Sequence, residues 1–197
     1  MNIHLASQSK TRAKLLKNAN IPFMTIVHGV DEDEIKLAFA DLAPKDIVMK
    51  LAELKALQPS TSSKNDLVIG SDQVLDFKGK LFNKAKDKQN AREQLLELCG
   101  NSHTLITATV VAQNKKIIWR HLDQSTLTMH NLSINEIDNY INNINTNVLD
   151  FVGVYAVEQE GIKLFDKIDG DFFSIQGLSI LPLINFLREY NLILQND

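Results

Sequence analysis

A pattern suited to anion binding stands near the amino terminus, in the segment LASQSKTRAKLL at residues 5–16. A short apolar strand leads directly into Ser7 and Ser9, and the helix expected next carries Arg12 on its first turn. The first amides of a helix lack partners within the helix, and the helix dipole adds partial positive charge there. Serine hydroxyls and an arginine fork would complete a phosphate-binding turn. The same residues also fit a structural role, in which a serine caps the helix and the cations face solvent.

Acidic residues at two positions could bind a divalent cation. Asp31 and Glu32 closely follow an expected strand, and neighbouring carboxylates supply the hard oxygen ligands that Mg²⁺ and Mn²⁺ need. The run DEDE is equally typical of a solvated loop. The segment VIGSDQV at residues 68–74 places Asp72 at the carboxyl end of a buried strand, where ligands bind in open α/β sheets. The alternative is that Asp72 caps a turn.

Three further charged residues fall at the ends or on the faces of expected elements. Lys55 lies on a helix, one face away from its leucine stripe, and Lys84 follows an expected hairpin at residues 73–82. Glu158 ends a strand expected at residues 153–158. Such residues are ordinarily solvated. The sequence contains no Ser-His-Asp arrangement, Cys-His pair, phosphate-binding P-loop or dinucleotide fingerprint. Spacing alone therefore predicts an α/β domain with a phosphate and metal site.

The elements that must position these residues alternate between strands and helices. Apolar runs predict strands at residues 2–6, 23–29, 66–72, 103–113, 116–122, 153–158 and 161–168. Helical spacing predicts helices at residues 9–19, 45–57, 87–99 and 133–141, with one more at the end of the chain. Hairpins are expected around Lys78 and Gly79 and around Asn114 and Lys115. This alternation predicts one mixed α/β domain, with an elongated sheet that has helices on both sides.

Composition narrows the class of protein. The chain has 197 residues, a formal net charge of −3 and a hydrophobic fraction of 44%, which suits a soluble domain with an ample core. The slight negative charge argues against a broad nucleic-acid-binding face, but not against a pocket for one phosphorylated molecule. A single cysteine, Cys99, excludes an internal disulfide. No membrane span or signal peptide is expected, and the expected location is the cytoplasm.

Eight short motifs occur in an order that resembles the Maf family of nucleoside triphosphate pyrophosphatases, over nearly the whole chain. The motifs are LASQSKTRAKLL, the Asp31 and Glu32 pair, LAELKA, GSDQV, NKA, LCGNSHTLIT, DFVGVYAVE and GDFFSIQGLSI. Each motif is short, but eight in this order are highly specific. The resemblance implies one α/β domain over residues 1–197. Its elongated mixed β-sheet would be flanked by helices, with two lobes around a nucleotide cleft, as in inosine triphosphate pyrophosphatase.

The family's activity, as the resemblance implies it, is metal-dependent cleavage of the α–β bond of a nucleoside triphosphate to a monophosphate and pyrophosphate. Asp72 resembles the catalytic aspartate that acts as general base toward water. Glu32 resembles the acidic partner for the metal, so Glu32 and Asp72 are the expected ligands of Mg²⁺ or Mn²⁺. The residues that match the groups holding the triphosphate are Ser7, Arg12, Lys55 and Lys84, and the two lysines count among the catalytic set.

The resemblance also bears on the base. Gln73 and Glu158 stand where pyrimidine-selective members have threonine and glutamine, and both are similar to the subgroup that acts on 7-methyl-GTP. That subgroup usually has an aromatic residue where this chain has Thr11, so Thr11, Gln73 and Glu158 are expected to contact the substrate. A dTTP or UTP pyrophosphatase remains an alternative.

A second alternative belongs to a different class of protein. The family is also associated with nucleotide sensing that inhibits septum formation without catalysis. Retention of Asp72, Glu32, Lys55 and Lys84 favours the enzyme, because a sensor needs no general base. The expected partner is a nucleotide, with no nucleic acid and no membrane. A homodimer and the preferred metal are left open.

Overall fold

The computed structural model describes residues 1–59, 61, 63–143, 148–190 and 192. The chain divides into two compact units, each assembled from segments that are far apart in the sequence. The first unit comprises Met1–Asp72, Thr107–Asp123 and Asp171–Asp197, and the second comprises Gln73–Ile106 and Gln124–Gly170. The single domain expected over residues 1–197 stays a prediction.

The strands of the described residues form a mixed seven-stranded sheet in the order β2-β1-β3-β5-β6-β7, with β4 paired to β3. In the first unit, β1 (Ile3–Leu5) pairs in parallel with β2 (Met24–Thr25) and with β3 (Leu67–Phe77). The parallel register sets Leu5 opposite Ile69, so the start of β3 is fixed against the amino-terminal strand. The mixed α/β fold expected from the sequence is confirmed, whereas the two lobes around a cleft stay a prediction.

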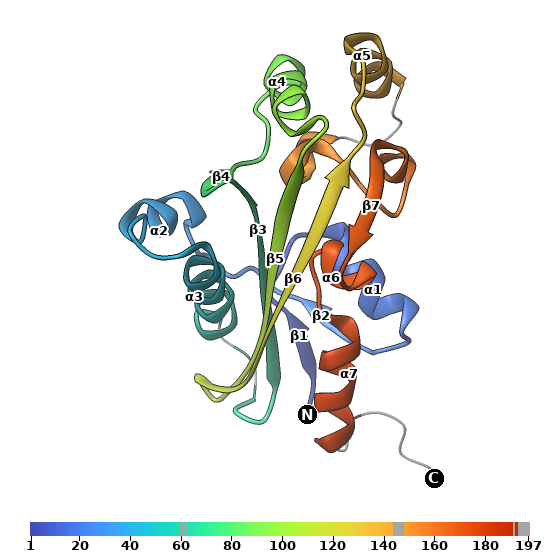
Figure 1. Ribbon diagram of the computed structural model, residues 1–197. Coiled ribbons are helices and arrows are strands. Elements are labelled where there is room, and N and C mark those ends of the chain that lie inside the picture. Colours follow the sequence, from blue (N-terminus) through green and yellow to red (C-terminus); the bar gives the residue numbers. More distant parts are fainter. Residues whose placement is uncertain (60, 62, 144–147, 191, 193–197) are drawn as a thin grey trace. The chain divides into compact units, whose positions relative to one another are not determined.

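The long strands β5 (Ser102–Gln113) and β6 (Lys116–Met129) form the expected hairpin (Figure 1). Asn114 and Lys115 at its tip both have positive φ angles, of 47° and 60°. A two-residue connection with positive φ at both positions matches the twist of the flanking strands. Asparagine is one of the residues that adopts this conformation readily, which is why the turn was visible in the sequence.

Among its described residues the first unit has five helices, and two of them carry expected site residues on their first turn. The helices are α1 (Lys10–Asn18), α2 (Glu32–Ala38), α3 (Pro44–Leu57), α6 (Phe172–Ile175) and α7 (Ile180–Glu189). Pro44 opens α3, where its missing N–H costs nothing. One cluster of buried side chains joins β1, β3, α1 and α7, and it includes Leu5, Leu16, Ile69 and Leu183. This cluster holds α1 against the sheet through the second half of the helix.

The second unit contains β4 (Lys80–Phe82), α4 (Lys88–Leu98), α5 (Ile134–Asn143) and β7 (Phe165–Asp169). The capping box expected before α5 is present, because Glu136 accepts a hydrogen bond from the Ser133 amide at 2.7 Å and Ser133 Oγ accepts from the Glu136 amide. Among the described residues, no helix has both the length and the apolar character that a bilayer span requires.

Two strand expectations in the second unit were wrong or too long. Residues 153–158 form no strand, because Gly153 and Val154 have φ angles of +78° and +65°, a left-handed conformation that extended chain cannot include. They belong instead to a short 3₁₀ turn, Val152–Val154, and a second one covers Glu160–Leu164. Of the strand expected at 161–168, only residues 165–168 are extended, as part of β7, which runs to Asp169. The apolar residues of 153–158 suggested a strand because they are buried, but the backbone there forms a turn.

Two expectations in the first unit also need correction. The strand expected at 23–29 shrinks to Met24–Thr25. Asp72 does not end a strand, because β3 runs on without interruption to Phe77, where the hairpin to β4 begins. The carboxylate therefore projects from the middle of an eleven-residue strand.

Candidate active site

The amino-terminal end of α1 organises two serines and an arginine. Ser9 is the helix cap, since its hydroxyl accepts a hydrogen bond from the Arg12 amide at 3.3 Å. Ser7 is buried, and its hydroxyl accepts from the Ser9 amide and from Arg12 Nη1, both at 3.2 Å. The structural and functional interpretations therefore divide between the two serines. Ser9 caps the helix, whereas Ser7 fixes the side chain of Arg12 by accepting a hydrogen bond from its guanidinium group.

Arg12 is anchored a second time by a distant segment of the same unit. Its Nε donates to the carbonyl oxygen of Gly177 at 2.6 Å. Burial lowers the pKa of Arg12, and the nearby charges of Asp72 and Glu32 oppose this effect. An arginine remains protonated under all ordinary conditions, so the site keeps a fixed positive charge.

Lys55 is the central residue of the arrangement. It comes from α3 and is only 3% exposed, although an unpaired lysine is almost never buried. Its Nζ lies 2.6 Å from Asp72 Oδ1 and 2.6 Å from Glu32 Oε1. Two carboxylates from two different elements therefore share one buried ammonium group, and the expectation that brought these three residues together rested on the family resemblance alone.

Asp31 and Glu32, adjacent in the sequence, take separate roles. Asp31 caps α2, because its carboxylate accepts from the amides of Asp33 and Glu34. Glu32 contacts Lys55 instead. Burial raises the pKa of Glu32, but the charge and hydrogen bond of Lys55 outweigh it, so the pKa lies below its ordinary value. Glu32 is therefore ionised at neutral pH.

The residues present fit a divalent cation that takes part of its coordination from the substrate. Asp72 Oδ2 is buried and has no hydrogen-bond partner among the described residues, so one carboxylate oxygen is left available. The part of the chain that the structure describes holds no group of three or more histidine, cysteine or acidic residues suited to a metal. Magnesium is commonly bound by one or two carboxylates together with substrate phosphates, which is the donor set that Asp72 and Glu32 would give.

The remaining expected site residues are Thr11, Gln73, Lys84 and Glu158. Thr11 is half-buried on the first turn of α1. Gln73, Lys84 and Glu158 belong to the second unit. Gln73 follows Asp72 on β3, Lys84 is exposed after β4, and Glu158 lies in the turn just before the 3₁₀ segment Glu160–Leu164. Their place in a substrate site stays a prediction.

The segment that carries Glu158 is supported by a buried aromatic cluster of the second unit. His103 Nε2 lies 2.6 Å from the Tyr155 hydroxyl, and burial lowers the pKa of His103 to about 4. His103 is therefore neutral near pH 7. A Cβ atom on Gly153 would lie 2.6 Å from both the Tyr155 ring and the Leu75 side chain, so only glycine fits there. These contacts fix the backbone just before Glu158.

Sequence reasoning missed three residues of the first unit that surround the site. His28 is close enough for the charges of Lys55, Glu32, Arg12 and Asp72 to affect it, although burial is the main reason that its pKa is lowered. Ser71 and Gly177 contact each other through the Gly177 carbonyl. The only sequence signal for Ser71 was its position next to Asp72. The only signal for Gly177 was its place in the motif GDFFSIQGLSI.

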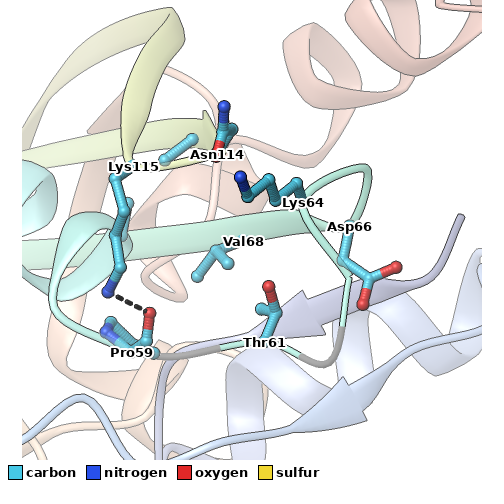
Figure 2. Close-up of a pocket in the computed structure, with 9 residues that line it drawn as sticks. Pro59, Thr61, Lys64, Asp66, Val68, Asn114 and Lys115 are labelled. Atoms are coloured by element: carbon cyan, nitrogen blue, oxygen red, sulfur yellow. Dashed lines mark hydrogen bonds between the residues drawn. The ribbon is translucent and has the colours of Figure 1, made fainter.

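A cavity of about 220 Å³ in the first unit is separate from these groups (Figure 2). It is lined by Ala56, Pro59, Thr61, Lys64, Asp66, Val68, Ala112, Asn114 and Lys115. Its polar groups serve the fold. Lys115 Nζ donates to three successive carbonyls at the end of α3, including that of Pro59 at 2.7 Å, and Asp66 accepts from the Asn2 amide and lies 3.3 Å from His4 Nε2. None of the expected site residues lines it.

A mixed α/β protein with a fixed arginine at a helix amino terminus and a buried lysine between two carboxylates is equipped to bind a phosphorylated small molecule. The chain belongs to the Maf family, because the model of the family described as Maf-like protein matches residues 2–190.

Two curated relatives illustrate the match. The chain is 45% identical over 188 residues to the nucleoside triphosphate pyrophosphatase of Caulobacter vibrioides, covering 94% of each chain. It is 41% identical over 186 residues to the 7-methyl-GTP pyrophosphatase of Brucella abortus, covering 93% of this chain and 94% of that protein. Among solved structures, a HAM1 protein from Coxiella burnetii is 14% identical with a TM-score of 0.39, covering 67% of this chain and 74% of that one, a likeness too weak to support an argument.

Proposed function

We propose that the protein hydrolyses a nucleoside triphosphate at the α–β bond, with a divalent cation, and releases a nucleoside monophosphate and pyrophosphate. The observation that carries this proposal is the buried Lys55 between Glu32 and Asp72, with one oxygen of Asp72 left without a partner among the described residues. Membership of the Maf family and relatives named for this activity support it. The cellular role would be removal of non-standard nucleotides before they enter nucleic acid.

The contacts divide the chemical work among the residues. Lys55 holds Oδ1 of Asp72, so Oδ2 is the atom that accepts a proton from the attacking water. Arg12, with its guanidinium fixed by Ser7, binds phosphate oxygens. Glu32 would hold the cation together with Asp72, whose Oδ1 keeps a second lone pair beside the Lys55 contact, so that Oδ2 stays free for the proton. The cation, when bound, neutralises charge on the phosphates. Phosphoryl transfer depends mainly on such positioning and charge neutralisation.

The test is a panel of nucleoside triphosphates assayed for phosphate with malachite green, with and without added inorganic pyrophosphatase. Phosphate that appears only when pyrophosphatase is present identifies pyrophosphate as the product, and therefore the α–β bond as the one cleaved. Because the coupling enzyme itself needs metal, metal dependence is measured separately, by chromatography of the monophosphate with Mg²⁺, Mn²⁺ or chelator. No release from any nucleotide with either metal would contradict the proposal and favour the sensing alternative.

For the base, we propose a preference for guanine nucleotides, and above all for 7-methyl-GTP. A carboxylate at Glu158 offers only acceptors, and guanine presents two adjacent donors, N1–H and the 2-amino group. Methylation at N7 makes the ring cationic, which strengthens both donors. Glu158 lies in a turn, so the alternation of strand side chains does not decide between it and Gln159. A relative from Brucella abortus is named for 7-methyl-GTP.

Glu158→Gln is expected to shift the preference toward UTP and TTP, because glutamine offers one donor and one acceptor to the imide of a pyrimidine. The measurement compares kcat/KM for 7-methyl-GTP, GTP, UTP and TTP in both proteins. Glu160→Gln is the matched control, since Glu160 is exposed and pairs with Lys163. A clear preference of the unmodified protein for UTP or TTP would refute the carboxylate argument.

Lys84→Ala is expected to lower kcat/KM by about tenfold or more, with a higher KM, because an exposed lysine that binds phosphate oxygens contributes to substrate and transition state alike. Lys86→Ala is the control, because Lys86 is also exposed and only two residues away. An equal, small effect of both substitutions would assign Lys84 to the solvated surface.

A further inference from the structure

The carbonyl oxygen of Gly177 accepts hydrogen bonds from two residues of the candidate site. Arg12 Nε donates to it at 2.6 Å, and Ser71 Oγ lies 2.8 Å away. Ser71 is completely buried and immediately precedes Asp72, and its single hydroxyl proton is shared between this carbonyl and that of Ala108, also at 2.8 Å. One backbone oxygen therefore joins the phosphate-binding arginine to the strand that carries the general base.

This carbonyl and Ser7 together fix the plane of the guanidinium group. Nε donates to Gly177 and Nη1 donates to Ser7, so the planar fork of Arg12 has two anchors on two different atoms. Five N–H groups are available on an arginine, and these two bonds leave three for another acceptor. A phosphate group is the acceptor that such a fork fits best.

Position 177 tolerates only glycine in this arrangement. Its φ angle is +96°, which residues with a side chain rarely adopt. A Cβ atom there would also lie 3.2 Å from Arg12 Nε and 3.5 Å from Nη2, close enough to displace the guanidinium by a few tenths of an ångström. The nearest neighbour of any added side chain is thus the arginine itself.

We infer that Gly177 is a positioning residue, which acts through Arg12 to orient the guanidinium toward the triphosphate, with Ser71 holding the Gly177 carbonyl in place. The inference rests on the proposed function, since it assumes that Arg12 binds phosphate. It gives a role in the site to a backbone group of the motif GDFFSIQGLSI, for which the sequence had suggested none.

Gly177→Ala is expected to raise KM for the nucleotide about tenfold and to change kcat little, because a misdirected arginine weakens substrate and transition state together. Partial unfolding would instead lower kcat and leave KM unchanged. Gly79→Ala is the matched control. Gly79 also has a positive φ angle, of +83°, but no atom within 4 Å of an added Cβ, so it reproduces the backbone strain without the contact. An unchanged KM in Gly177→Ala would overturn the inference.

A double-mutant cycle with Arg12→Ala separates positioning from general damage. Gly177→Ala should change kcat/KM by less than about twofold once Arg12 is absent, because the two substitutions remove one interaction. Equal effects in both backgrounds would overturn the inference. Where Gly177→Ala does not fold, Ser71→Ala replaces it in the cycle. Ser125→Ala is then the control, because Ser125 Oγ is buried without a partner among the described residues.

Binding of an α,β-methylene nucleoside triphosphate is measured by calorimetry on the same variants. It distinguishes failure of the proposed hydrolysis from failure of the positioning role of Gly177. A wild-type protein that binds the analogue but hydrolyses no triphosphate contradicts the proposed function, and the cycle in Kd still tests Gly177. A coupling between Gly177 and Arg12 in Kd supports the positioning role. Additive effects, or no binding to the wild-type protein, would overturn it.

Discussion

Asp72→Asn is expected to reduce kcat at least about a hundredfold while the protein stays folded, because an amide cannot accept the proton from water. The structure explains why the fold should survive. The amide oxygen of asparagine can still accept from Lys55, and Lys55 keeps its other ion pair with Glu32. The amide nitrogen replaces Oδ2, the atom that makes no hydrogen bond within the described chain. The measurement is steady-state kinetics beside thermal unfolding.

The control for this experiment is Asp76→Asn on the same strand, where the carboxylate accepts a hydrogen bond from the Gly79 amide in the hairpin. It should leave kcat unchanged. Turnover by Asp72→Asn close to that of the unmodified protein would remove Asp72 from the mechanism.

Lys55→Met should lower both activity and the free energy of unfolding, the latter by about 3 kcal/mol at neutral pH, because it leaves buried negative charge uncompensated. Asp72 is only 3% exposed and accepts one of the two hydrogen-bonded contacts of Lys55. The activity should fall at least about a hundredfold, since the orientation of the general base is lost. Lys45→Met, an exposed position on the first turn of the same helix, is the matched control for denaturant unfolding.

The pH dependence of the Lys55→Met loss has a definite sign. The pKa of Glu32 is lower in the folded protein than in the unfolded chain, because Lys55 stabilises the ionised carboxylate against the opposing effect of burial. Its stabilisation is therefore complete above the unfolded value, about 4.3, and disappears as the pH falls through the lower folded value. The difference in unfolding free energy between the two proteins should narrow below about pH 4. A difference in unfolding free energy that stays constant as the pH falls below about 4 would show that Lys55 acts by packing alone.

Much of the fold could be predicted because its determinants are local. The capping box at Ser133 and the Asn114 turn depend on contacts between residues a few positions apart. The strand expected at 153–158 failed for the opposite reason. Its apolar residues are buried by tertiary contacts, and the left-handed backbone at Val154 leaves no trace in hydrophobic spacing. Burial and strand conformation are separate properties, and the pattern reports only the first.

The site shows the same division. Ser9 as a helix cap follows from three residues of sequence. The burial of Lys55 could not be predicted from its helix, because the charges that make it tolerable come from β3 and from the start of α2. The family resemblance identified Glu32, Lys55 and Asp72 as site residues. That Lys55 contacts one oxygen of Asp72 and leaves the other without a partner among the described residues could be learned only from the structure. Gly177 lies 165 residues from Arg12 and carries no side chain, so no pattern of residue types could join them.

The interleaved construction of the first unit has a consequence for the order in which the protein is made. Its core joins Leu5 of the first strand to Leu183 of the last described helix. The contacts between β1 and α7 can therefore form only after almost the whole chain has been synthesised. Contacts of such long separation are slow to form, and synthesis proceeds from the amino terminus. A nascent chain that ends before Gly177 already contains Arg12 but not the carbonyl that fixes it. The arginine proposed to bind phosphate is therefore translated early, and the carbonyl that fixes it is translated late.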